Sequence, residues 1–216
     1  MHSALFRLFT LILHIAFTTT ALPAQKKSNE MTAAQVLQIV PKSKHCSSSM
    51  NECATNIQAT PFLNAAMSKY DITNPMEKAS VLALIAFESG DFKYNINHFP
   101  APGHPGQGTR NMQSASYNLE YAKSIPELAS KTSYTSTEGL SPDQLNEIRA
   151  LVLPDEYSWA SAAWYLTQQS SCSDARQALQ AGSDEGFAAH MRCVGISNIG
   201  NDRISYWQAA KKALIP

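Results

Sequence analysis

Glu88 is the residue whose type and position best suit chemistry. It lies in residues 80–92, SVLALIAFESGDF, where apolar side chains recur three and four positions apart, as on one face of a helix. Val81, Leu84 and Ile85 belong to that face, and Glu88 takes its next place. A carboxylate there must either find an internal partner, such as a buried arginine or a helix cap, or lie beside a cavity with a raised pKa. The second case describes a general acid near neutral pH, and we expect Glu88 to be one.

The helix that carries Glu88 has clear start and stop signals. Asn74 is a good N-cap, Pro75 suits the first helical position, and Glu77 stands where a capping-box side chain would be. Gly90 follows as a stop signal. The sequence therefore predicts a helix over about residues 75–89 that presents Glu88 near its end.

A long loop follows this helix. Residues 95–110, NINHFPAPGHPGQGTR, contain three prolines and three glycines, which exclude a long helix. A loop of this length inside a compact domain is usually functional, so we expect it to fold over the Glu88 carboxylate. His98 and His104 would form hydrogen bonds within the loop or, together with Asn95 and Asn97, a polar rim of the cleft. The histidines lack a third ligand at a recognised spacing, so no metal site and no cofactor are predicted.

The rest of the chain is predicted to be helical, with almost no strand pattern. We therefore expect an all-α single domain. The predicted helices cover residues 33–39, 61–70, 75–89, 114–124, 142–152, 157–168, 174–181, 184–193 and 202–214, with caps at Ser141, Ser183 and Asn201.

The first residues have the features of a secretory signal peptide. A short region with Arg7 precedes an apolar run over residues 8–17, and small residues lead to cleavage after Ala21 or Ala24. We assign residues 1–24 to the signal peptide, 25–45 to an N-terminal leader and 46–216 to the helical domain, and expect an extracellular protein. No later segment could span a bilayer.

Four cysteines in an exported chain indicate two disulfides. Three pairings are possible, and the local one joins Cys46 to Cys53 and Cys172 to Cys193. Metal ligation or free thiols at Cys46 and Cys53 is the alternative, although this spacing is wider than a zinc knuckle allows. The chain has 17 basic and 17 acidic residues. This balance argues against nucleic acid and membrane partners, and we expect a monomer.

Three segments in order resemble the signature of the transglycosylase SLT family, the soluble lytic transglycosylases and goose-type lysozymes of glycoside hydrolase family 23. They are LIAFESGDF, GQGTRNMQ and SWASAAWYL, and the similarity covers about residues 61–168. The family pattern is Glu-Ser, then Gly-Leu-Met-Gln, then Ala-Ala-Tyr-Asn. Arg110 and Asn111 stand where the family has Gly-Leu, and Trp164-Tyr165 where it has Tyr-Asn. With its Pro/Gly-rich loop and its two pairs of cysteines, the sequence resembles a divergent branch of this family that is secreted by eukaryotes, with fungi as one candidate source.

The resemblance implies a lysozyme-like fold and assigns a role to each matching residue. Glu88 would be the catalytic acid, Ser89 would orient the substrate or the acid, and Met112-Gln113 would contact sugar. Trp164 or Tyr165 would line the floor beneath the reacting ring. Tyr94, Asn97 and Phe99, in or beside the loop, are further candidates for contact, whereas Trp159 and Trp207 fit a core better.

A glycosidase usually needs two carboxylates, and the second is not evident here. Asp91 could position a water, and Glu120 and Asp155 are more distant candidates, although each fits a solvated surface charge better. The resemblance implies that one glutamate can act as acid and then base, while the acetamido or 6-hydroxyl group of the substrate completes the displacement. This would require an N-acetylated amino sugar.

The sequence therefore predicts a secreted enzyme that cleaves β-1,4-linked N-acetylated polysaccharide, most of all peptidoglycan. One alternative is a non-catalytic carbohydrate-binding or effector-like protein on the same scaffold, which the departures at Arg110, Asn111 and Trp164 favour. Another is a chitinase or chitosanase.

Overall fold

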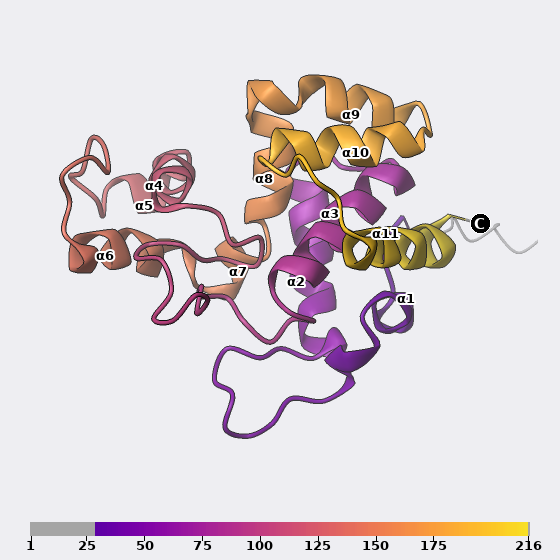
Figure 1. Ribbon diagram of the computed structural model, residues 1–216, viewed down its shortest axis with the longest axis horizontal. Coiled ribbons are helices and arrows are strands. Elements are labelled where there is room, and N and C mark those ends of the chain that lie inside the picture. The colour runs from indigo at the N-terminus through magenta and orange to yellow at the C-terminus, as the bar shows by residue number, and fades with distance from the viewer. Residues whose placement is uncertain (1–28, 216) are drawn as a thin grey trace, which may run out of the picture.

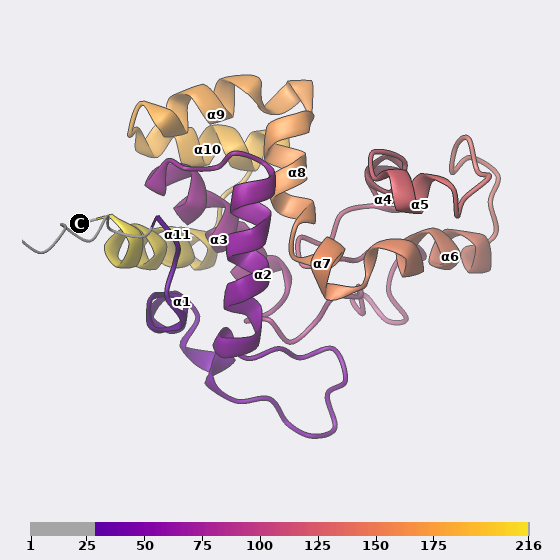
Figure 2. The same cartoon turned by 180° about the vertical axis from the view of Figure 1, so that it is seen from behind.

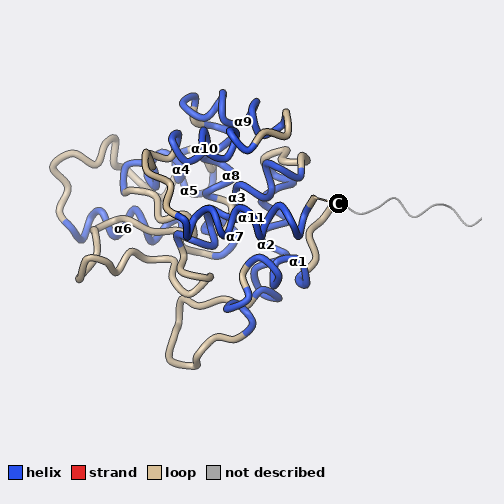
Figure 3. The backbone as a smooth tube through the Cα atoms, turned by 45° about the vertical axis from the view of Figure 1, so that its right-hand side comes forward, coloured by secondary structure: helices blue, strands red, loops and turns tan. Residues whose placement is uncertain are grey.

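The structure is a computed structural model in which residues 29–215 are described. The predicted signal peptide, its two cleavage sites and the first part of the predicted leader lie outside the described residues. Within them, helices are joined by loops and turns, and the backbone tube shows no strand (Figure 3). The pairing between extended segments in this part of the chain consists of two isolated bridges, Ile96 with Gly108 and Gly108 with Gln113. The prediction of an all-α single domain is confirmed.

The helices follow the predicted order. They are α1 (Ala33–Ile39), η1 (Pro41–Lys44), α2 (Asn56–Lys69), α3 (Pro75–Glu88), α4 (Ala115–Lys123), α5 (Pro126–Ala129), α6 (Pro142–Val152), α7 (Asp155–Ser158), α8 (Ser161–Gln168), η2 (Ser170–Cys172), α9 (Ser173–Gln180), α10 (Asp184–Cys193) and α11 (Asn201–Leu214). The short helices η1, η2 and α5 were not predicted, and the segment expected at 157–168 is divided into α7 and α8.

Two start signals differ from the prediction. Helix α2 begins at Asn56 and not at Pro61, because Thr55 and Gln58 form a capping box more than one turn earlier. Pro61 is tolerated inside the helix since the carbonyl that it leaves without a donor belongs to Ile57, whose side chain is exposed. Helix α11 begins after Gly200, and Asn201 is its first residue instead of its cap.

Helix α3 is the centre of the molecule. Its residues from Met76 to Ala86 are all buried, and it packs against α8, α9 and α11. Helices α4, α5 and α6 lie together at one end of the molecule, apart from α1–α3 and α8–α11, with α7 between the two groups (Figures 1 and 2). The chain crosses from the larger group to the smaller one through residues 89–114, directly after Glu88.

The predicted leader is part of the domain over its described residues. Met31, Val36, Ile39 and Val40 are buried in the same core as α3, and α1 packs against α2 and α11. The Lys78 ammonium of α3 also binds the Asn29 carbonyl. The domain therefore begins before Cys46, because the apolar face of α1 is needed to cover the core.

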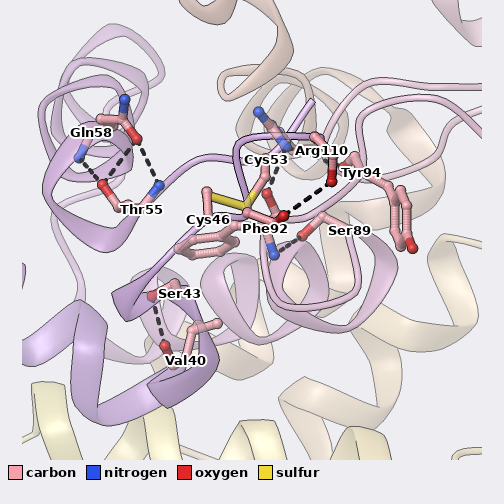
Figure 4. The surroundings of a disulfide bond; sticks show 12 residues. Val40, Ser43, Cys46, Cys53, Thr55, Gln58, Ser89, Phe92, Tyr94 and Arg110 are labelled. Atoms are coloured by element: carbon pink, nitrogen blue, oxygen red, sulfur yellow. Dashed lines mark hydrogen bonds between the residues drawn. A yellow bond between two sulfur atoms is a disulfide. The ribbon is translucent and has the colours of Figure 1, made fainter. Parts of the chain in front are cut away.

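Both predicted disulfides are present. Cys46 and Cys53 are 7 positions apart in the sequence, and Cys172 and Cys193 are 21 positions apart. The first disulfide lies beside Phe92 and Arg110, so it supports the start of the long loop (Figure 4). Across the described residues, every helix is too short or too polar to cross a bilayer.

Candidate functional site

A cavity of about 290 Å³ lies where the two helix groups meet. This volume is near the lower end of ligand-binding pockets, which span roughly 300–1,000 Å³. Helix α3 contributes Leu84 and Glu88, and the other groups come from the end of the loop, from α4, from α8 and from the segment after α10. The full lining is Leu84, Glu88, Gln107, Asn111, Met112, Gln113, Ser114, Tyr117, Tyr165, Val194 and Ile196.

Glu88 lies in the wall of this cavity, with its side chain 19% exposed. Its Oε1 is 2.7 Å from Nη1 of Arg203 on α11, and the Arg203 guanidinium lies 3.8 Å above the centre of the Phe87 ring. Burial raises the pKa of the Glu88 carboxyl above its ordinary value, although the Arg203 charge opposes this effect. Glu88 thus combines both sequence-based alternatives, because it has an arginine partner and also opens onto a cavity.

Glu77, on the same helix, does not form the predicted capping box. Asn74 caps α3 with its own side chain, which accepts from the amides of Met76 and Glu77. The Glu77 carboxylate instead turns toward α9, where it accepts from Arg176 at 2.7 Å and Gln180 at 3.1 Å. It lies fully inside the protein and bridges two helices.

Ser89 is placed behind the cavity. Its hydroxyl donates to the Ile85 carbonyl at 2.6 Å and accepts from the Phe92 amide at 3.0 Å, and the residue is fully buried. It closes the end of α3 and is absent from the cavity lining. The structure therefore places Ser89 where it supports the turn after Glu88, and not at the cavity wall where a contact with substrate was predicted.

The end of the loop holds two side-chain amides at the cavity wall. The hydroxyls of Thr109 and Ser161 donate to Asn111 Oδ1 at 2.7 and 2.6 Å. This fixes the orientation of the amide, and Asn111 Nδ2 donates to Gln113 Oε1 at 3.3 Å. Gln113 Nε2 in turn donates to Asn118 at 2.8 Å. Asn111 and Gln113 are thus positioned by buried partners, as groups of a preorganised binding site are.

The backbone of this segment is strained. Thr109 has φ +65° and Met112 has φ +50°, in the left-handed region that a β-branched or bulky residue rarely adopts. Two further non-glycine residues with positive φ, Asp91 and Phe92, lie three and four residues after Glu88. Such strain costs about 1–3 kcal/mol per residue and concentrates at functional sites. The segment after Glu88 and the end of the loop therefore both contain strained backbone of the kind found at functional sites.

Arg110, where the SLT family has glycine, points away from the cavity. Its guanidinium lies 4.4 Å from the centre of the Trp159 ring. It donates to the carbonyls of Phe92 and Tyr94 at 3.1 and 3.2 Å (Figure 4). Burial lowers its pKa to about 10, so it stays charged at neutral pH. Arg110 connects the loop to the core and leaves the cavity wall to Asn111.

Of the two aromatic residues matched to the family tyrosine, Tyr165 lines the cavity. Its ring packs edge-on against Tyr117 of α4, with the centroids 4.8 Å apart. Trp164 is absent from the lining and packs in the core against Tyr121 at 4.9 Å. Trp159 and Trp207 are buried core residues, as predicted.

The first half of the long loop lies outside the cavity wall. Tyr94 is 41% exposed and packs against His98, and Phe99 is 83% exposed. The Asn97 side chain accepts from the amide of His104 at 2.9 Å. Only the end of the loop, from Gln107 onward, reaches the wall beside Glu88. The structure therefore does not bring Tyr94 and Asn97 to the site predicted for them.

Glu88 is the single acid among the described residues that line the cavity. Asp91 is not a solvated charge as expected, because it is 6% exposed and accepts from the Tyr206 hydroxyl at 2.6 Å. Glu120 is exposed and binds Gln169, and Asp155 accepts from the Trp159 indole. In the described part of the chain, no three His, Cys, Asp or Glu residues gather as metal ligands would.

Several residues of this site were not predicted from the sequence. Gln107, Tyr117, Val194 and Ile196 line the cavity, and Arg203 contacts Glu88. Gln107 lies within the recognised GQGTRNMQ segment and Tyr117 lies four residues after its end, so their nearness to it was an available signal. Val194, Ile196 and Arg203 could not have been found in this way, because nothing in the sequence of α11 or of the segment after α10 indicates that these residues lie beside Glu88.

No family profile matches this chain. The chain is 46% identical, over 158 residues or 72% of its length, to a protein of Fusarium oxysporum (strain Fo5176) named bifunctional dioxygenase (DOX)-epoxy alcohol synthase (EAS). The match spans 12% of the length of that protein. The Fusarium protein is an enzyme by its name, but the activity named is that of a much longer chain.

Proposed function

We propose that this protein is a secreted enzyme that cleaves β-1,4-linked polymers of N-acetylated amino sugars, most of all peptidoglycan, with Glu88 as proton donor. One observation carries the proposal: a carboxyl group with a raised pKa forms part of the wall of a cavity whose other polar side chains are amides and the hydroxyls of serine and tyrosine. Such a wall suits an uncharged, hydroxyl-rich ligand. The two disulfides support an oxidising destination.

In the proposed reaction, protonated Glu88 donates its proton to the glycosidic oxygen. The bond from that oxygen to the anomeric carbon breaks, and its electron pair leaves with the oxygen. The acetamido oxygen or the 6-hydroxyl of the same sugar then attacks the anomeric carbon. The Glu88 carboxylate accepts the proton released by the attacking hydroxyl or by the water that opens the acetamido adduct. One carboxylate is sufficient for this sequence, in agreement with the single acid of the cavity wall.

The remaining lining residues fit the binding of one sugar unit. Asn111 and Gln113 offer amide groups that are already oriented, and the faces or edges of Tyr117 and Tyr165 offer apolar surface. An amide donor suits the carbonyl oxygen of an acetamido group. The activity named for the Fusarium protein is not transferred, because the match covers only 12% of it.

The test is lysis of bacterial cell walls by the folded protein across pH 4 to 8. We expect the Glu88→Gln variant to lose activity by about 10²–10⁴-fold, since it removes the general acid. The wild type should lose activity as the pH rises through the raised pKa of Glu88, because only the protonated carboxyl can donate.

Glu120→Gln is the matched control, because Glu120 is an exposed carboxylate that binds Gln169 and does not line the cavity. It should retain activity in the folded fraction. Product masses separate the possible reactions: anhydro-muramyl ends indicate a transglycosylase, and reducing ends a hydrolase. Activity on chitin or chitosan alone would replace the peptidoglycan assignment, and a folded wild type inactive on all three polymers would refute the proposal.

The Glu88–Arg203 contact favours a second candidate, a carbohydrate-binding protein without turnover. A carboxylate 2.7 Å from an arginine nitrogen is held toward its charged form, which cannot donate a proton. In that case the wild type and Glu88→Gln would both bind insoluble peptidoglycan, and neither would release soluble sugar.

A further inference from the structure

Arg203 is the charged group that faces Glu88 from another element. It comes from the first turn of α11, and its Nη1 lies 2.7 Å from Glu88 Oε1. The two side chains are 16% and 19% exposed, so water screens the pair only partly. Helices α3 and α11 pack closely along their lengths, which fixes the distance between the two backbones.

The contact is an ion pair to Oε1 of the carboxyl group and not an aligned hydrogen bond, because Arg203 Nη1 has no hydrogen-bond partner among the described residues. Arg203 approaches Oε1, and the described residues provide no hydrogen-bond donor to Oε2. A protonated carboxyl carries its proton on one oxygen, and the oxygen that does not face the cationic arginine is favoured for it. The geometry therefore divides the two oxygens, with Oε1 held by the arginine and Oε2 left for the proton.

Aromatic side chains of α3 and α11 hold the Arg203 guanidinium in place. Its guanidinium stacks on the face of Phe87, the residue before Glu88, with 3.8 Å to the ring centre. Tyr206, one turn along α11, packs edge-on against the same ring at 6.3 Å. Tyr206 also donates to Asp91 at 2.6 Å, just after the end of α3. These contacts keep the guanidinium beside Glu88 whether or not the carboxyl is charged.

We propose that Arg203 is a positioning residue for Glu88, which directs Oε2 into the cavity and stabilises the carboxylate that remains after the proton has been donated. Its catalytic consequence rests on the proposed function, but its effect on the Glu88 carboxyl does not. A glutamate that acts first as acid and then as base needs both states to be accessible. Burial favours the neutral state and Arg203 the charged one.

The other groups around Glu88 leave Arg203 as the dominant charge. Tyr117 of α4 and Tyr165 of α8 are the titratable side chains that share the cavity wall with it, and burial raises the pKa of Tyr165, so this residue stays neutral at physiological pH. Arg110 is in the neighbouring loop, but its guanidinium packs on Trp159. Among the described lining residues, Glu88 is the only carboxyl group, and none is a lysine, arginine or histidine.

The test measures the carboxyl group itself. The ¹³C signal of the Glu88 carboxyl, assigned by its loss in Glu88→Gln, is titrated in the wild type and in Arg203→Gln and Arg203→Lys. We expect Arg203→Gln to raise the midpoint by about 1 pH unit or more, and Arg203→Lys to keep much of the wild-type value, because lysine retains the charge. Arg176→Gln removes the equivalent partner of Glu77 on the same helix and should leave the Glu88 midpoint unchanged.

The activity profile is the second readout. The alkaline fall of the activity should move to higher pH in Arg203→Gln by the same interval as the carboxyl midpoint, and kcat should fall more than KM rises. Equal midpoints in the wild type and in both Arg203 variants would overturn the inference. A shifted midpoint in a protein that cleaves no polymer would instead refute the proposed function and leave the assignment of Arg203 intact.

Discussion

Glu77 and Glu88 lie on the same helix, and each has an arginine nitrogen 2.7 Å away. Glu77 is 1% exposed and also accepts from Gln180, so it is enclosed between α3 and α9. Glu88 opens onto the cavity, and burial raises its pKa in spite of its arginine. The same residue type with the same kind of partner thus supports the fold in one place and is suited to proton transfer in the other.

The substitutions Glu88→Gln and Glu77→Gln should therefore have opposite effects on the free energy of unfolding near neutral pH. Because the pKa of Glu88 is raised in the folded protein, its favourable contribution is complete below the unfolded pKa and is lost as the pH rises through the folded pKa. Glu88→Gln should therefore become more stable relative to the wild type from pH 4 to pH 8. Glu77→Gln should lose about 2 kcal/mol at pH 7, because it leaves Arg176 without its charged partner. Urea unfolding at both pH values measures this, and a Glu88→Gln variant whose stability relative to the wild type stays constant or falls from pH 4 to pH 8 would contradict it.

At the scale of elements, the loop between α3 and α4 is placed by Arg110. Its side chain replaces the glycine of the SLT pattern, stacks on Trp159 and binds two carbonyls of the turn after α3. Glu52, in the loop closed by Cys46 and Cys53, accepts from the amides of Asn95 and Ile96 at 2.9 Å each. These contacts connect three segments that contain no regular structure.

Arg110→Met should therefore destabilise the domain by about 3 kcal/mol, because the buried Phe92 carbonyl and the partly buried Tyr94 carbonyl lose a charged donor and the contact with Trp159 is weakened. Unfolding in urea, followed by Trp fluorescence, measures the loss. Arg192→Met is the control, because Arg192 is an exposed partner of Glu185 and should change stability by less than about 1 kcal/mol. Equal losses in the two variants would show that Arg110 does not hold the loop.

At the scale of the whole molecule, His190 joins α10 to the central helix. It is fully buried, and its Nδ1 lies 2.6 Å from the Ser80 hydroxyl of α3. Its Nε2 has no hydrogen-bond partner among the described residues. Burial lowers its pKa to about 4, so the folded core holds it in the neutral state.

Acid should therefore weaken the whole domain through this one side chain. Below the unfolded pKa of about 6.5 the unfolded chain takes up a proton that the folded core excludes, so stability falls as the pH drops from there toward 4. The loss is about 3 kcal/mol by this reasoning. His190→Gln keeps a partner for Ser80 and should lack this part of the pH dependence. Parallel stability curves for the two proteins between pH 7 and pH 4 would contradict the prediction.

Much of the fold followed from local signals. The helices at residues 142–152 and 184–193 have the predicted bounds because their caps, Ser141 and Ser183, are short-range features. Both disulfides were predicted from spacing alone. The prediction failed where a nearby signal was outweighed by another, as at Pro61, where the capping box of Thr55 and Gln58 begins the helix earlier.

The sequence by itself determined that the chain is helical and that one glutamate interrupts an apolar face near the end of a helix, because caps, periodicity and the loop composition act within a few residues. Only the tertiary structure decided which side chains surround that glutamate. Arg203 comes from a helix more than a hundred positions away, and Tyr165 rather than Trp164 faces the cavity because the packing of α8 against α3 and α4 sets its rotation. Those contacts depend on how the helix groups meet, which no local pattern encodes.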